Sequence, residues 1–70
     1  MPYYMYNLEV NKQGDHEVHK ETCDQMPRLG NRKTIGWFTN CEKAIAAVKE
    51  KTGKDNFNGC FYCCKDCHTN

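Results

Sequence analysis

The sequence predicts a small α+β domain, and three observations carry that prediction. Apolar residues alternate with polar ones near the N-terminus, an amphipathic segment runs from Thr39 to Gly53, and four of the six cysteines lie in a C-terminal tail that begins at Cys60. The 70 residues are expected to form one domain, 1–70. A core of that size is marginal, so small domains usually add a disulfide, a metal ion or a partner subunit.

The first element predicted is a β-hairpin. Alternate positions from Tyr3 to Val10 carry large apolar side chains, which is the period of a strand; they are Tyr4, Tyr6, Leu8 and Val10. A polar turn with a glycine covers 11–15, and 16–19 can pair back as the second strand. With those four residues toward the core, Tyr3 and Met5 lie on the other face, where they are a candidate surface for self-association.

A polar, basic loop is predicted for 22–34, followed by a short third strand over 35–38. The loop holds the densest group of basic residues: Arg28, Arg32 and Lys33. Cations beside Trp37 are what a single-stranded nucleic acid would contact. The alternative is that these are solvated charges ahead of a strand whose Trp37 and Phe38 are core, and the net charge of +1 favours it.

One amphipathic helix is predicted after the third strand. Thr39 and Glu42 have the spacing of an N-terminal capping box, and Gly53 is a typical C-terminal stop. The apolar stripe has the helical period and consists of Cys41, Ala44, Ile45 and Val48. Cys41 is therefore expected to be a small core residue.

The cysteine-rich tail suggests a metal site. Two cysteines separated by two residues can bind one zinc ion, and the tail offers Cys60 with Cys63 and Cys64 with Cys67. One pair is half of a tetrahedral site. His19 and Cys23 are the natural other half, so the predicted zinc ligands are His19, Cys23, Cys60 and Cys63. Such a site would tie the hairpin to the tail and stabilise a short chain by closing a long loop.

Other roles for the tail remain open on the sequence. Cys64, Cys67 and His68 are alternative ligands. The four tail cysteines also have helical spacing, so a terminal helix could bury them as thiols. A redox dithiol and a disulfide scaffold are further alternatives. The N-terminus has no pattern of a secretory signal, which predicts a cytoplasmic location, where metal ligands, buried thiols or redox groups are favoured over structural disulfides. No segment has the length and apolarity needed to cross a bilayer.

No catalytic constellation is recognisable. The chain lacks a glycine-rich phosphate loop and a cysteine, histidine and carboxylate at a known catalytic spacing. We therefore expect a non-enzymatic zinc-binding module that mediates an interaction with an unknown protein partner or with itself. The alternatives are a thiol-based redox or metal-handling protein and a weak nucleic-acid-binding module that uses the basic loop.

Three motifs carry a family resemblance: His19 to Cys23, Gly36 to Ala44, and Gly59 to Cys63. With them the chain resembles short uncharacterised bacterial cysteine-rich proteins and the zinc-binding domain of Ada-type DNA alkylation-repair proteins. The resemblance implies a zinc fold in which Cys23, Cys60 and Cys63 match ligand positions. His19 stands where that family has its methyl-accepting cysteine. An imidazole cannot perform that transfer, so the resemblance supports the metal fold and counts against the repair chemistry.

Overall fold

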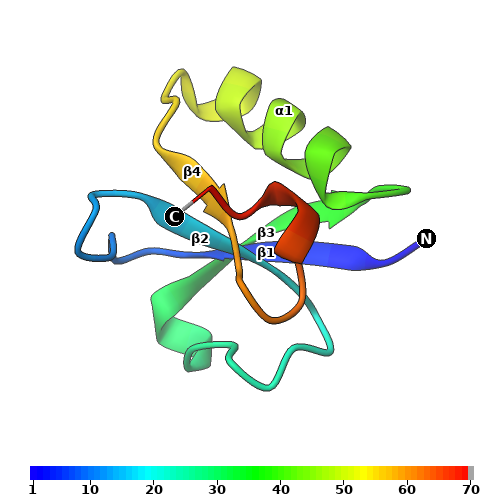
Figure 1. The fold of residues 1–70 in the computed structure, drawn as a ribbon, viewed down its shortest axis with the longest axis horizontal. Helices are drawn as coiled ribbons and strands as arrows, with labels where there is room; N and C mark the ends of the chain where they lie inside the picture. The colour runs from blue at the N-terminus through cyan, green and yellow to red at the C-terminus, as the bar shows by residue number, and fades with distance from the viewer. Residues whose placement is uncertain (70) are drawn as a thin grey trace.

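The predicted α+β class is confirmed by the structure, a computed structural model that describes residues 1–69. A four-stranded sheet is covered on one side by a single helix (Figure 1). The strands are β1 (Tyr3–Asn7), β2 (His16–Lys20), β3 (Arg32–Trp37) and β4 (Phe57–Gly59). The helix is α1 (Cys41–Thr52), and two 3₁₀ turns, η1 (Leu29–Asn31) and η2 (Lys65–Cys67), complete the elements.

The strand order is β3-β1-β2-β4, and its register sorts the side chains onto two faces. β1 pairs antiparallel with β2 and with β3, whereas β4 runs parallel to β2. Tyr6 lies opposite Val18, and Met5 lies opposite His19. Because successive residues of a strand point to opposite faces, Val18 and His19 point away from each other. Val18 faces α1, and His19 faces the other side.

The hydrophobic core lies between the sheet and α1. Its buried members are Tyr4, Val18, Cys41, Ala44, Val48, Phe57 and Cys64. The helix begins after Asn40, whose side-chain oxygen accepts a hydrogen bond from the Lys43 N–H at 2.9 Å, and ends at Gly53, which has a φ of 72°. The predicted extent of the helix is thus correct, but its N-cap is Asn40 and not Thr39. Asparagine caps at least as well as threonine, and its position brings Cys41 into the first turn.

The strand β4 was not predicted, because its region reads as a polar connection with only one large apolar residue, Phe57. Phe57 is buried, and its ring stacks on that of His16 at a centroid distance of 5.2 Å. The backbone of His16 also donates to the Asn56 carbonyl at 2.8 Å. Long-range contacts that the local sequence does not encode therefore specify this three-residue strand.

Several side chains differ from their predicted environments. β1 ends at Asn7, so Leu8 and Val10 are exposed and not part of the core. Trp37 is 58% exposed at the sheet edge, where its ring meets Tyr3 edge-on. His16 is buried, and its Nδ1 atom lies 2.7 Å from the Asn7 carbonyl oxygen. That contact makes Nδ1 the protonated nitrogen, since a carbonyl only accepts.

Candidate metal centre

Two neighbouring strand ends bring the first two candidate ligands together. His19 is on β2, is fully buried and points to the face opposite α1. Cys60 follows directly after β4, and its N–H donates to the Val18 carbonyl at 2.9 Å. Because β2 and β4 run parallel in register, Cys60 comes to lie beside His19. Both side chains are at least 98% buried.

Two tight turns supply the other pair. After β2 the chain turns with the Cys23 N–H bonded to the Lys20 carbonyl at 3.0 Å. After β4 it turns again, and the Cys64 N–H bonds to the Cys60 carbonyl at 2.9 Å. The second turn places the thiols of Cys60 and Cys63 on one side, as expected for two cysteines separated by two residues.

The four candidate ligand atoms, from His19, Cys23, Cys60 and Cys63, all lie within 4.8 Å of one another. The sulfur atoms of Cys23 and Cys60 are 3.8 Å apart, and Cys63 Sγ is 4.0 Å from His19 Nδ1. Two sulfur atoms bound to one tetrahedral zinc ion at about 2.3 Å are about 3.8 Å apart. The group can therefore hold a metal ion without a large rearrangement of the backbone.

His19 is oriented for coordination through Nδ1. That nitrogen faces Cys63, while Nε2 is buried without a hydrogen-bond partner and lies 3.7 Å from Glu17 Oε1. Burial lowers the pKa of His19 below its usual 6.5, against a smaller opposing effect of the Glu17 charge. The neutral ring is the form that binds metals. Glu17 was not predicted as part of the site. The sequence feature that could have indicated it is its position two residues before His19, which places both side chains on the same face of β2.

Backbone N–H groups point at two of the sulfur atoms. The Lys20 N–H donates to Cys63 Sγ at 3.3 Å, and the Gln25 N–H donates to Cys23 Sγ at 3.4 Å. Such donors stabilise a thiolate. Burial nevertheless raises the pKa of Cys23, with the Gln25 hydrogen bond acting the other way. A bound cation would supply the missing stabilisation, because it favours the deprotonated thiol directly.

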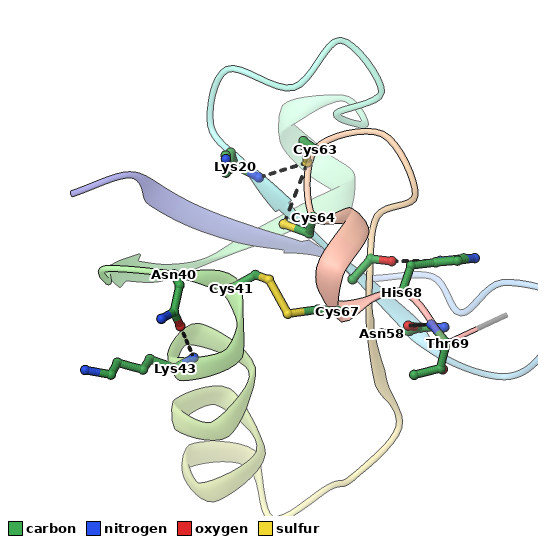
Figure 2. Close-up of a disulfide and its surroundings, with 11 residues drawn as sticks. Lys20, Asn40, Cys41, Lys43, Asn58, Cys63, Cys64, Cys67, His68 and Thr69 are labelled. Atoms are coloured by element: carbon green, nitrogen blue, oxygen red, sulfur yellow. Dashed lines mark hydrogen bonds between the residues drawn. A yellow bond between two sulfur atoms is a disulfide. The ribbon is translucent and has the colours of Figure 1, made fainter.

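The second half of the tail lies outside this group of four, and Figure 2 shows Cys64 next to Cys63 and Cys67 bonded to Cys41. Cys64 is 2% exposed and belongs to the core under α1, and burial raises its pKa to about 12. Cys67 forms a disulfide with Cys41. His68 Nδ1 lies 3.0 Å from the Gly59 carbonyl oxygen. None of the three alternative ligands, Cys64, Cys67 and His68, therefore belongs to the group of four donor residues.

The Cys41–Cys67 disulfide differs from the expectation that this chain favours metal ligands, buried thiols or redox groups over structural disulfides. Cys41 is buried on the helix stripe as predicted, but it is bonded and not a free thiol. The alternative of a terminal helix that buries four thiols does not hold either, since in 60–69 the only helical residues are Lys65–Cys67, which form a 3₁₀ turn. A disulfide from α1 to η2 adds a second cross-link to a chain with a small core.

Comparisons of the chain with protein-family models, curated proteins and solved structures found no match. The resemblance to Ada-type zinc-binding domains and to short bacterial proteins therefore stays a prediction that rests on the three motifs. Within residues 1–69, no helix is long and apolar enough to span a membrane.

Proposed function

We propose that the chain is a small zinc-binding module in which one Zn²⁺ ion, held by His19, Cys23, Cys60 and Cys63, has a structural role. The observation that carries the proposal is the convergence of four donor atoms within 4.8 Å. They come from two segments about 40 residues apart, so that one ion would connect the β2 end of the sheet to the tail. Three sulfur atoms and one imidazole are a donor set typical of structural zinc.

A structural role for the metal ion is supported by the number of protein ligands, because four donors complete a tetrahedral site. Catalytic zinc sites usually keep one coordination position for water or substrate, whereas four protein ligands fill the tetrahedron. The two buried ligands, His19 and Cys60, also leave little room for a substrate on their side. On these grounds we propose a non-enzymatic module.

Cobalt substitution tests the proposed ligand set. Co²⁺ bound in a tetrahedron of three thiolates and one imidazole shows intense visible d–d bands and a thiolate charge-transfer band. We expect both bands at one equivalent, and we expect Cys60→Ala to weaken them strongly. Cys64→Ala is the matched control, since it also removes a buried tail thiol but leaves the four ligands in place. Equal spectra for the wild type and Cys60→Ala would refute the proposed site.

A metal-handling role is the second candidate, and partial exposure of Cys23 and Cys63 favours it. An ion with two accessible sulfur ligands can be passed to a competing thiol, because ligand exchange begins at the exposed ligands. Transfer of zinc to a chelator on the timescale of seconds would support this role. Retention over hours would support the structural role.

For the interaction we propose the sheet edge around Trp37 as the contact surface. Tyr3 and Trp37 pack edge-to-face at a centroid distance of 4.9 Å, and Trp37 is among the most exposed large side chains of the sheet. Exposed aromatic residues are enriched in protein interfaces.

If the partner is a second copy of the chain, bound through Tyr3 and Met5, then Tyr3→Ser should weaken the self-association measured by sedimentation. Binding of single-stranded nucleic acid would instead depend on Arg28 and Lys33 and weaken with added salt.

A further inference from the structure

A second group of sulfur atoms lies beside the candidate zinc site. The Cys41–Cys67 disulfide joins the first turn of α1 to η2, and Cys64, the residue before η2, belongs to the same buried cluster as Cys41. Cys41 and Cys64 are 8% and 2% exposed and belong to one buried cluster, against which Cys67 packs. The proposed function uses none of these three sulfur atoms.

Cys63 connects the two groups. Its sulfur atom lies 4.0 Å from His19 Nδ1 on one side and 3.8 Å from Cys64 Sγ on the other. The second distance equals the separation of Cys23 Sγ and Cys60 Sγ within the first group. It also matches the separation of about 3.8 Å between two sulfur ligands of one tetrahedral ion. Figure 2 shows Cys64 between Cys63 and the Cys41–Cys67 disulfide.

We propose that reduction of the Cys41–Cys67 disulfide opens a second metal site, in which Cys41, Cys64 and Cys67 bind a thiophilic divalent ion and share Cys63 with the first ion. The reduced chain would then hold a two-ion thiolate cluster, and the disulfide form would hold one ion. The proposal rests on the proposed zinc site only for the sharing of Cys63.

The reaction balances with an external thiol as reductant. Two low-molecular-weight thiols supply two electrons and two protons, and they leave as their own disulfide. The Cys41–Cys67 bond becomes two thiols. The entering ion displaces one proton from each of the three thiols of Cys41, Cys64 and Cys67, and these protons go to solvent. Cys63 is already a thiolate on the first ion and bridges through a second lone pair.

The surroundings favour an ion at this place. Cys41 is the first residue of α1, where free backbone N–H groups stabilise a negative sulfur. Three thiolates in a core are costly without a compensating cation, which the ion supplies. A surface hollow offers an entry path, because Cys41, Cys63 and Cys64 all line it. Its other walls include Tyr4 and Lys20.

Cadmium NMR tests the proposal. ¹¹³Cd²⁺ is added to the wild type with the disulfide intact, and separately after reduction with a phosphine that is then removed. We expect one ¹¹³Cd resonance from the disulfide form and two from the reduced form. In a proton–cadmium correlation spectrum of the reduced form, the β-protons of Cys63 should couple to both resonances.

Two variants assign the signals. Cys64→Ala should lose the second resonance and keep the first, whereas His19→Ala should lose or shift the first. Circular dichroism checks that each variant is folded. The comparison of the two redox states of the wild type needs no substitution, so it stands even if Cys64→Ala does not fold.

The outcomes separate this proposal from the zinc site. One resonance in both redox states, or a second resonance that persists in folded Cys64→Ala, would overturn the second site. A second resonance in the reduced form without the first would support the second site and overturn the proposed zinc ligands. Absence of bound cadmium in either state would overturn both.

Discussion

Glu17 should strengthen metal binding through His19, and Glu17→Gln should weaken the affinity for zinc about fivefold. The Nε2 atom of His19 is buried without a hydrogen-bond partner, and Glu17 Oε1 at 3.7 Å is the charge that faces it. The metal-bound ring is neutral and directs its Nε2–H toward this carboxylate, a contact longer than a hydrogen bond and open to solvent, since the Glu17 side chain is 36% exposed. Such a contact is expected to contribute about 1 kcal/mol, which corresponds to about fivefold in affinity. Loss of a well-placed outer carboxylate usually costs about 10- to 100-fold, and the long separation makes a smaller effect reasonable here.

Competition with a chromogenic zinc chelator measures this effect. Glu21→Gln is the matched control, because it removes the same charge from an exposed residue just beyond β2. We expect the control to bind zinc like the wild type. Equal losses in the two variants would show a general charge effect, and no loss in Glu17→Gln would refute the contact between Glu17 and the metal-binding ring.

Three further predictions concern the support of the site. A methyl group at Gly59 would lie 2.6 Å from the Cys64 carbonyl and 2.7 Å from Cys67 Cβ, so Gly59→Ala should lower the free energy of unfolding by about 1 to 3 kcal/mol. Gly30→Ala is its control, since a methyl group there meets nothing within 4 Å, and urea unfolding that ranks the two equally would contradict the packing. Val18 is fully buried under α1, so Val18→Ala should cost about 2 to 3 kcal/mol in the same assay, and a loss below about 0.5 kcal/mol would contradict its place in the core. Burial lowers the pKa of His19 in the folded protein, so the unfolded chain takes up its proton first as the pH falls. The stability of the zinc-free protein should therefore decrease below about pH 6.5, and a His19→Gln variant that keeps the same pH dependence would contradict this origin.

Much of the fold could be predicted because the relevant signals are local. The helical period from Cys41 onward and the stop at Gly53 are readable from neighbours in the chain. The alternation in β1 is equally local, although it continues past the end of the strand to Val10. The grouping of His19 and Cys23 with the first half of the tail followed from ligand spacing and from the need for a distant partner pair.

The remaining features depend on contacts between distant segments. β4 exists because Phe57 and Asn58 pair with β2, and neither residue has a strand pattern around it. The partner of Cys41 could not be predicted, because spacing does not encode disulfide connectivity. Glu17 was overlooked for a similar reason: a carboxylate beside a histidine gains meaning only once the ring nitrogen that faces it is known.

Native mass spectrometry of the chain, purified without chelator, tests the central claim most directly. The measured mass reports both the bound metal and the number of hydrogens lost in disulfide formation. We predict one zinc ion per chain and a mass lower by two hydrogens, for the Cys41–Cys67 disulfide. Cys60→Ala should abolish the bound zinc, and Cys64→Ala should retain it. A metal-free chain with six free thiols, or one that lacks six hydrogens through three disulfides, would contradict the account.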